Sequence, residues 1–309
     1  MHVSIIICTY NRSRSLLNTL ESIDKMKVPA GILWEVIVID NNSSDNTQEK
    51  VLSYNFNNHP VQLRYIKEEN QGVAFARNLG IQESTGEIIV FMDDDEVADT
   101  LWLAKILEPF NTNSADCVGG KILVKYPEGY KKPVWLLNEL EGFIGKLDYG
   151  GEKPMLLDNP ETPVFTGNSA FSRRVFKEAG LFNTQLGRRG TQTFGGEDVE
   201  MSRRILKAGF SIFYQPEAVV YHIIGQDKLK KNYFRKLHFF EGEKRGYFID
   251  QPPGKNIIGI PLYIFPQFIR SIFRYLNNPT LRLQMNIWWH MGFIKGRMES
   301  CFSTLLRSS

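Results

Sequence analysis

Cysteine is scarce in this 309-residue sequence, and the three cysteines form no recognisable pattern. Cys8, Cys117 and Cys301 are odd in number, lie far apart and fall in no metal-ligand spacing, which argues against a disulfide framework and a zinc site. A reducing compartment is therefore expected. Cys8 lies within an apolar strand, and we interpret it as a small core residue rather than a nucleophile.

Long apolar runs are also missing. The longest apolar stretch, residues 257–269, is interrupted by Gly259, Pro261 and Pro266 and is shorter than the roughly 20 residues of a membrane-spanning helix. The N-terminal apolar run ends at Cys8 and has no basic leader, so no secretory signal peptide is expected. These features predict a cytoplasmic protein.

Two phosphate-binding signatures are absent as well. The sequence contains neither Gly-x-Gly-x-x-Gly nor a Walker loop, which argues against a dinucleotide dehydrogenase and against a P-loop kinase or ATPase. A diphosphate would therefore have to be held by a cation. The length allows one large α/β domain with an appendage, or two small domains.

The net charge of +3 conceals an uneven distribution. From Lys228 onward there are 14 basic against 4 acidic residues, a balance of +10. The first 227 residues carry the remaining 23 basic and 30 acidic residues, a balance of −7. The two ends of the protein are therefore expected to meet different partners.

Strand and helix patterns alternate over about the first 95 residues. Apolar strands are predicted at 3–8, 34–39, 61–66 and 88–92, and the first three are followed by a polar loop and a helical pattern. Such alternation predicts a parallel sheet with right-handed crossovers.

Three acids, Asp93, Asp94 and Asp95, end the fourth predicted strand. In open α/β sheets, ligands bind beyond the carboxyl ends of the strands. Like charges so close together repel one another, and a divalent cation is the simplest relief. A solvated acidic turn is the alternative.

The remaining pattern is less regular. It predicts a helix at 101–107, a strand at 117–124, a long loop region over the site at 125–163, a strand at 163–171, a short helix at 174–179, and two edge strands at 211–214 and 218–221 that end at His222. Gly196-Glu197-Asp198 opens a further helix, where glycine permits close approach of a ligand. The alternatives are a capped surface helix and a structural histidine.

In this order the features resemble the family 2 glycosyltransferases, which are inverting sugar-nucleotide enzymes with a GT-A fold. The resemblance covers about residues 1–225. It rests on six motifs: Thr9-Tyr10-Asn11-Arg12, Asp40 to Asp45, Asn70-Gln71-Gly72 with Ala76 to Gly80, Phe91 to Asp95, Thr166-Gly167-Asn168, and Gly196-Glu197-Asp198. Each motif is weak alone, but six in order form a specific pattern.

The resemblance implies an α/β GT-A fold, with one Rossmann-like, mostly parallel sheet flanked by helices and a basic, aromatic helical extension at the C-terminus. The catalytic domain would span 1–225, with a nucleotide-binding half at 1–115 and an acceptor-side half at 116–225. The extension would span 226–309.

Site residues follow from the resemblance. The donor nucleotide would be bound by Thr9, Tyr10, Asn11, Arg12, Asp40, Asn42, Arg77, Asp93 and Asp94. Asp95, with Asp93, would hold Mn²⁺ or Mg²⁺, and His222 would add a contact to metal or diphosphate. Asp198 would be the catalytic base, with Gly167, Asn168 and Glu197 on the acceptor side. From the residues alone, Asp40 could be a turn former, Arg77 a solvated helix residue and Asn168 a strand-end amide.

The implied reaction moves one sugar, with inversion, from a nucleoside-diphosphate sugar to a hydroxyl of a carbohydrate or lipid-linked acceptor, in cell-surface polysaccharide or glycolipid synthesis. UDP is the commonest donor nucleotide in the resembling family, and GDP and dTDP stay open. Gln-x-x-Arg-Trp and spanning helices, which processive synthases carry, are absent. The alternatives are a metal-dependent sugar nucleotidyltransferase and an inactive sugar-nucleotide binding module.

The C-terminal extension is predicted to attach the protein peripherally to an anionic, cytoplasmic membrane face. Apolar residues from Ile257 to Phe273 alternate with Lys255, Arg270 and Arg274, and further on Trp288, Trp289 and Phe293 lie near Lys295 and Arg297. Aromatic and basic residues favour the lipid headgroup level, and the prolines favour an interfacial helical hairpin. Packing against the catalytic domain or a second subunit is the alternative. No nucleic-acid-binding module accompanies the basic cluster.

Overall fold

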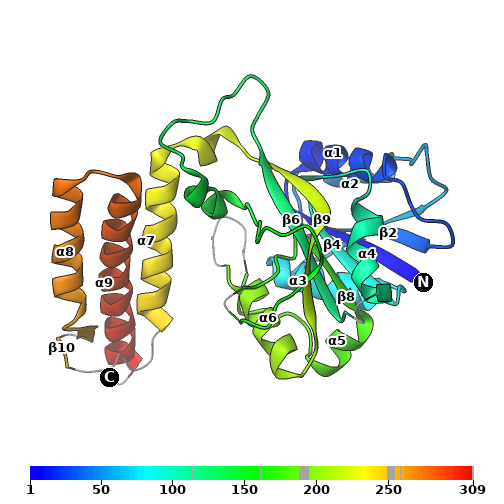
Figure 1. Ribbon diagram of the computed structural model, residues 1–309. Helices are drawn as coiled ribbons and strands as arrows, with labels where there is room; N and C mark the ends of the chain where they lie inside the picture. The colour runs from blue at the N-terminus through cyan, green and yellow to red at the C-terminus, as the bar shows by residue number, and fades with distance from the viewer. Residues whose placement is uncertain (113–114, 161, 188–194, 249–254, 258, 308–309) are drawn as a thin grey trace. The chain divides into compact units, whose positions relative to one another are not determined.

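The computed structural model describes residues 1–112, 115–160, 162–187, 195–248, 255–257 and 259–307. The chain divides into two compact units. Unit 1 comprises Met1–Tyr126 and Gly145–Ile224, and unit 2 comprises Pro127–Ile144 and Gly225–Ser309 (Figure 1). The predicted loop region 125–163 is therefore divided between the units, and part of it forms a 3-10 helix, η1 (Asn138–Ile144).

The first half of unit 1 alternates strands and helices as the sequence predicts. The strands are β1 (His2–Thr9), β2 (Leu33–Asp40), β3 (Gln62–Lys67) and β4 (Ile88–Asp93), and the helices are α1 (Ser13–Asp24), α2 (Thr47–Leu52) and α3 (Val73–Glu83). β1 pairs in parallel with β2 and β4, and β2 pairs in parallel with β3. The carboxyl ends of these strands therefore meet at one edge, where Thr9 is paired with Asp40 and Cys8 with Asp93.

The second half adds strands in both directions: β5 (Glu96–Ala98), β6 (Cys117–Lys125), β7 (Met155–Leu156), β8 (Asn168–Ser172) and β9 (Ile212–Ile223). The sheet order is β3-β2-β1-β4-β8-β6-β9-β5, with β7 paired to β9. The prediction of two edge strands at 211–221 is wrong, because β9 is continuous and lies between β6 and β5. The pairing of β6 with β9 shifts its register between Gly120 and Lys121, and Pro216 lies in the corresponding bulge of β9. Proline is typical of turns, which is why the sequence pattern predicts a break at this point.

Alternate residues of the central strands face opposite layers of helices. Ile5 and Ile7 join a core cluster with side chains of α1 and α4 (Trp102–Thr112), whereas Ile6 joins a second cluster with α3, α5 (Arg173–Glu178) and α6 (Glu197–Lys207). Because both faces are covered, these strands are apolar throughout, and the predicted sheet flanked by helices is confirmed.

Burial raises the pKa of Cys8 to about 12, so its thiol stays protonated.

Unit 2 contains the helices α7 (Lys231–Phe248), α8 (Ile264–Asn277) and α9 (Leu281–Arg307), the 3-10 helices η1 and η2 (Gln226–Leu229), and the strand pair β10 (Asn256–Ile257) and β11 (Ile260–Pro261). Helices α7 and α9 lie side by side (Figure 1) and approach closely through glycines. A Cβ added at Gly292 would lie 1.9 Å from the backbone oxygen of Phe239, and one at Gly242 would lie 2.0 Å from that of Trp289. Glycine therefore sets the distance between these helices.

Several aromatic residues that the sequence assigns to a membrane surface lie within unit 2. Phe293 is buried and stacks with Trp289, and Trp288 makes an edge contact with Phe239. Arg297 is also buried. At these positions the side chains pack between helices, as in the alternative of packing within the protein, and Trp288 and Trp289 stay partly exposed. No helix in the described ranges is long and apolar enough to cross a bilayer.

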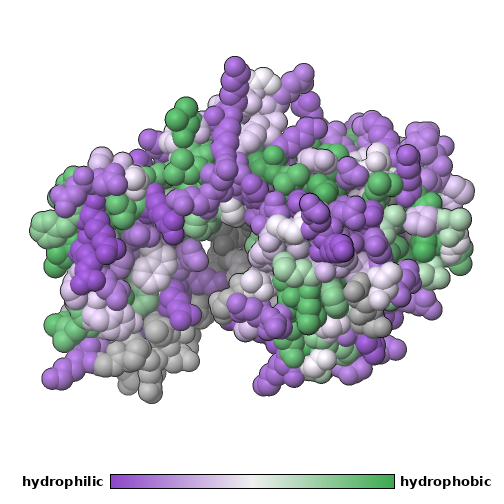
Figure 2. All heavy atoms as spheres, in the orientation of Figure 1, coloured by the Kyte–Doolittle hydropathy of each residue, from purple (hydrophilic) through white to green (hydrophobic). Residues whose placement is uncertain are grey.

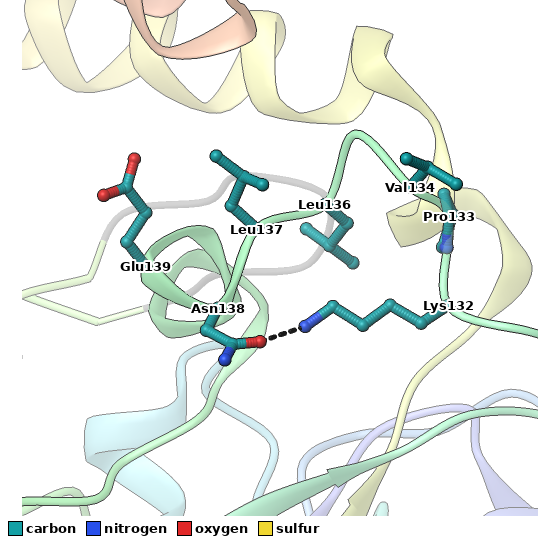
Figure 3. Close-up of a pocket in the computed structure, with 7 residues that line it drawn as sticks. All are labelled: Lys132, Pro133, Val134, Leu136, Leu137, Asn138 and Glu139. Atoms are coloured by element: carbon teal, nitrogen blue, oxygen red, sulfur yellow. Dashed lines mark hydrogen bonds between the residues drawn. The ribbon is translucent and has the colours of Figure 1, made fainter.

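An open cavity of about 640 Å³ lies in unit 2. Figure 3 shows that one segment, which leads into η1, supplies its lining: Lys132, Pro133, Val134, Leu136, Leu137, Asn138 and Glu139. The Lys132 amine donates a hydrogen bond to Asn138 Oδ1. None of the residues predicted to bind donor or metal lines this cavity, so we assign it no part in the reaction.

Candidate active site

Three polar loops are joined at the carboxyl edge of the unit 1 sheet. Asn11 adopts a left-handed backbone (φ 52°), and its Oδ1 accepts hydrogen bonds from the N–H groups of Ser44 (2.7 Å) and Asp45 (3.2 Å). Asn41 Oδ1 accepts a hydrogen bond from the Gly72 N–H at 2.8 Å. The motifs at 9–12, 40–45 and 70–72 therefore form one hydrogen-bonded surface.

Asp40 shapes this surface from the end of β2. It is buried, its Oδ1 accepts a hydrogen bond from the Ser43 N–H (2.8 Å), and its Oδ2 accepts one from the Tyr65 hydroxyl (2.7 Å). Asn42 follows in a left-handed conformation (φ 64°), which asparagine tolerates well. Asp40 is thus a turn former, and any contact to a donor base would share its oxygens with Ser43 and Tyr65.

The acidic run after β4 is tied to the first loop. The Thr9 hydroxyl donates to Asp94 Oδ2 at 2.7 Å, and Arg12 Nη1 lies 3.0 Å from Asp94 Oδ1 and 2.8 Å from Asp95 Oδ2. Burial raises the pKa of Asp94 to about 7; Arg12 opposes this shift, and the charges of Asp95 and Asp93 add to it. Asp93 and Asp95 keep 49% and 15% of their side-chain surface exposed. A ligand can therefore reach these two acids.

Strand pairing places His222 beside the acids. His222 is paired with Glu96 across β9 and β5, and its Nε2 lies 3.4 Å from Asp95 Oδ2. Gly145 (φ 101°) lies against the imidazole, and a Cβ there would be 2.3 Å from His222 Nδ1. The structure therefore brings together two of the three predicted metal ligands, Asp95 and His222.

Arg77 joins the acidic edge to the start of α6. Its Nη1 lies 2.9 Å from Glu197 Oε1 and 3.4 Å from Asp198 Oδ1, and its Nη2 lies 3.9 Å from Asp93 Oδ1. The guanidinium also lies 5.5 Å from the centre of the Phe182 ring. Arg77 is buried, so the solvated-helix alternative is wrong.

Asp198 lies in the first turn of α6, with 20% of its side-chain surface exposed. Its Oδ1 accepts a hydrogen bond from the Thr166 hydroxyl at 2.6 Å. Burial, followed by the charge of Glu197, raises the pKa of Asp198 to about 7, while Arg77 and Thr166 act in the opposite direction. A partly exposed carboxylate with such a pKa can accept a proton near neutral pH.

Gly167 and Glu197, both predicted on the acceptor side, lie within this network. A Cβ at Gly167 would lie 2.8 Å from Glu96 Oε1 and 2.9 Å from Asp93 Oδ2, so a larger residue here would displace these two carboxylates. Glu197 is buried, and its Oε2 has no hydrogen-bond partner in the described part of the chain.

Asn168 differs from the other predicted site residues because it is fully buried. Its Oδ1 accepts a hydrogen bond from Trp102 Nε1–H (2.8 Å), and its Nδ2 donates to the backbone oxygens of Lys121 (2.9 Å) and Ala218 (2.8 Å). The amide therefore joins α4, β6 and β9 and cannot reach an acceptor. The alternative interpretation of Asn168, an ordinary amide at a strand end, therefore describes the structure.

A divalent cation fits this edge if the substrate supplies some of its ligands. Among the described residues, no three His, Cys, Asp or Glu side chains converge as a complete metal site. Asp95 and His222 supply an oxygen and a nitrogen, and Mg²⁺ is usually held by one or two carboxylates together with substrate phosphates. The acids of this network, Asp93 to Glu96, Glu197 and Asp198, outnumber the arginines Arg12 and Arg77, so an added cation would reduce repulsion.

Sequence reasoning did not assign roles to three residues of this network. Thr166 binds Asp198, Glu96 lies buried beside Asp93, and Tyr65 binds Asp40. Thr166 begins the Thr166-Gly167-Asn168 motif, and Glu96 directly follows the three acids after β4. Both positions could therefore have been singled out from the sequence. Tyr65 lies in an ordinary strand pattern, and nothing in the sequence distinguishes it.

Residues 4–180 match the family model described as Glycosyl transferase family 2. The chain belongs to this family. Membership confirms the resemblance seen in the motifs and identifies the chain as a glycosyltransferase, which decides against the nucleotidyltransferase alternative.

Several curated relatives match most of the chain. It is similar to the succinoglycan biosynthesis protein ExoM of Rhizobium meliloti (28% identity, 80% of this chain and 74% of ExoM). It is also similar to two proteins of Haloferax volcanii, a glucosyl-dolichyl phosphate glucuronosyltransferase (26% identity, 78% and 75%) and glycosyltransferase AglE (25%, 91% and 85%).

Solved structures of similar fold agree with the GT-A prediction. GalNAc-T7 with UDP, GalNAc and Mn²⁺ has a TM-score of 0.57 at 19% identity, covering 92% of this chain and 56% of that one. The mannosyltransferase PcManGT of Pyrobaculum calidifontis, with GDP-Man and Mn²⁺, also has a TM-score of 0.57 at 19% identity, covering 99% and 75%. At such identities the likeness concerns the fold, and the predicted GT-A architecture is confirmed.

Proposed function

We propose that this glycosyltransferase moves one sugar from a nucleoside-diphosphate sugar to an acceptor hydroxyl, with inversion at the anomeric carbon. The position of Asp198 carries the proposal. Arg77 links Asp198 to the acidic edge at Asp93 within one network of charged groups. A proton acceptor therefore lies beside the place where a diphosphate and its cation would bind.

Asp198 is proposed to take the proton of the acceptor hydroxyl as that oxygen attacks the anomeric carbon. Its pKa of about 7 leaves a large fraction ionised at neutral pH and keeps the carboxylate basic. Arg77 and Thr166 hold the carboxylate in place. One displacement needs one base and no covalent nucleophile, which supports inversion.

The three joined loops are proposed to bind the nucleotide through Tyr10, Asn11, Arg12 and Asn42. Asp95 and His222, with Asp93, would hold Mn²⁺ or Mg²⁺. When bound, such a cation stabilises the negative charge that the leaving diphosphate gains. A UDP-sugar is the proposed donor, since UDP is the commonest donor nucleotide in the resembling family.

The acceptor is proposed to be a carbohydrate or a lipid-linked sugar in cell-surface polysaccharide or glycolipid synthesis. The names of two relatives support this: one acts in succinoglycan biosynthesis, and one acts on a glucosyl-dolichyl phosphate. The basic excess of the C-terminal region supports peripheral attachment at the cytoplasmic face of a membrane. In this proposal residues 1–225 carry catalysis and 226–309 carry attachment, with 127–144 joining the second unit.

A nucleotide-binding panel tests the proposal. UDP, GDP and dTDP are each titrated by calorimetry with and without Mn²⁺, and the nucleotide that binds is then offered as its sugar conjugates. We expect binding that requires the cation, and slow metal-dependent hydrolysis of the matching sugar nucleotide. Binding without any hydrolysis or transfer would favour the inactive binding module, and absence of binding for all three would overturn the donor assignment.

A further inference from the structure

Helix α8 carries an apolar surface that unit 2 does not cover. We call this surface the α8 stripe and define it by exposed residues: Pro266, Ile269, Phe273 and Leu276 at helical spacing on α8, and Leu262 in the turn before the helix. Four of these are large hydrophobic side chains with 40%, 52%, 63% and 68% of their surface exposed, in the order Leu262, Ile269, Phe273, Leu276. Positions separated by 3, 4 and 7 residues share one face of a helix.

The opposite face of α8 is already used for packing. Ile264 is buried in a cluster with Phe293, and Phe268 stacks on His290 of α9. Figure 2 shows hydrophobic residues in green at the left edge of the view, at the position of α8 in Figure 1. The α8 stripe is therefore an additional apolar face and does not belong to the core of unit 2.

Basic and aromatic side chains border the α8 stripe. Tyr263, Arg270 and Arg274 are exposed and follow one another at intervals of 7 and 4 residues, which places them on one flank of the stripe. Residues 251–298 contain six basic residues, Lys255, Arg270, Arg274, Arg282, Lys295 and Arg297, and no acidic residue. Arg297 is buried, and Arg282 and Lys295 pair with Glu139 and Glu243, so the charge beside the stripe comes from Arg270 and Arg274. Two exposed arginines on a helix without acids favour an anionic partner.

We propose that the α8 stripe inserts into the headgroup region of an anionic lipid bilayer, with α8 lying in the plane of the surface. This inference deepens the proposed membrane attachment and rests on it. The 14 residues of α8 extend only about 21 Å, whereas a hydrocarbon core is about 30 Å thick. An interfacial helix sinks its apolar face about 5–10 Å into the bilayer and leaves its cationic flank at the phosphates.

Charge favours lipid over a second copy of the chain as the occupant. Two α8 stripes in contact would bring Arg270 and Arg274 of both copies to one interface with no acid on either α8 to pair with them. An anionic headgroup layer supplies the missing negative charge, and Tyr263 has the amphipathic ring that favours headgroup depth. The α8 stripe thus replaces Trp288, Trp289 and Phe293 as the lipid-contacting surface.

Co-sedimentation of the full-length protein with vesicles tests the proposal. Vesicles contain equal parts of phosphatidylglycerol and phosphatidylcholine, or phosphatidylcholine alone. The stripe variant is Ile269→Ser/Phe273→Ser/Leu276→Ser, and its matched control, Leu33→Ser/Leu52→Ser, removes comparably exposed apolar residues from unit 1. A charge variant, Arg270→Gln/Arg274→Gln, is matched by Lys50→Gln/Lys67→Gln.

We expect the stripe variant to partition onto anionic vesicles at least about tenfold more weakly than wild type, with its control unchanged. The charge variant should lose roughly thirtyfold on anionic vesicles and little on neutral ones. Nucleotide binding should be the same in all variants, which separates this test from the donor assignment.

Three outcomes would overturn the inference. Equal sedimentation of wild type and stripe variant would leave membrane attachment standing and place it elsewhere on the protein. Failure of wild type to bind either vesicle would remove both the attachment and the α8 stripe. A lipid-free dimer in sedimentation velocity that the stripe variant converts to monomer would assign the surface to a second copy.

Discussion

The carboxyl edge of unit 1 and the outer face of α8 in unit 2 both concentrate charge, but they differ in burial and in partners. In unit 1 the acids are joined to Arg12 and Arg77, and much of the network is buried. In unit 2 Arg270 and Arg274 are exposed and α8 contains no acid. An unpaired buried charge is costly, so each acid and arginine of the unit 1 network is held in place by its partners. A fixed arrangement of this kind suits a reaction site. The second leaves its charge available to a partner surface.

The largest expected effect comes from the proposed base. Asp198→Asn keeps the shape of the side chain and removes its basicity, so kcat should fall by about 10²- to 10⁴-fold while donor affinity holds. Steady-state kinetics and calorimetry measure the two quantities. Glu200→Gln, on the same helix, is the matched control and should stay near wild type. Loss of donor binding in Asp198→Asn would instead indicate a structural role.

Removing a metal ligand should have the next largest effect. Asp95→Asn takes one charge from the edge beside His222, and we expect kcat/KM in saturating Mn²⁺ to fall by roughly 10²- to 10³-fold, as for loss of one electrostatic stabiliser. A Mn²⁺ titration of activity checks this, with Glu69→Gln, an exposed acid of unit 1, as control. Wild-type activity in Asp95→Asn would contradict the metal assignment.

The pH dependence of kcat/KM tests the proposed role of the buried charges in unit 1. The carboxylate of Asp198 is the active form, and its pKa of about 7 places protonation below neutral pH. Burial raises this pKa most, the charges of Glu197 and Asp93 raise it further, and Arg77 and the Thr166 hydroxyl lower it. Protonation of Asp198 alone makes kcat/KM fall tenfold per unit below the pKa, so by at least about 100-fold at pH 5, and Asp94, with a pKa of about 7, titrates in the same range. A profile flat from pH 5 to 8 would contradict the assignment.

Substitutions in the contact between α7 and α9 of unit 2 should change the free energy of unfolding. Gly296→Ala places a Cβ 1.9 Å from the backbone oxygen of Glu243, and overpacking of this kind costs about 1–3 kcal/mol of unfolding free energy. Gly142→Ala meets nothing within 4 Å and serves as the control. Thermal and denaturant unfolding measure the difference. Equal stability of the two variants would show that the contact between α7 and α9 relaxes at little cost.

The smallest expected effect is at Thr166. Its hydroxyl lowers the pKa of Asp198, so Thr166→Val should move the acid limb of the kcat/KM profile to higher pH. The pH-independent rate should fall by no more than about tenfold, since the base itself is retained. Thr166→Ser keeps the hydroxyl and should restore the wild-type limb. A reduced rate with an unmoved limb would mean that Thr166 only supports packing.

Several features could be read from the sequence because they depend on neighbouring residues. Strand and helix periods located β1 to β4 and α1 to α3, and the acids after β4 pointed to the carboxyl edge of the sheet. The motif containing Arg77 and the one containing Asp198 were each visible locally. Their joint pattern was sufficient to indicate the family, since order and spacing survive when the overall identity to relatives is low.

The sequence by itself determined the kinds of groups present, and the tertiary structure decided which of them meet. Arg77 and Glu197 are 120 residues apart and form an ion pair because α3 and α6 lie on the same face of the sheet. Asn168 and Trp289 carry polar and aromatic side chains that suit a ligand or a membrane, yet in the structure both serve packing. The α8 stripe became visible only when α9 covered one apolar face of α8 and left the other exposed. Burial depends on contacts between distant segments, and a local pattern does not contain that information.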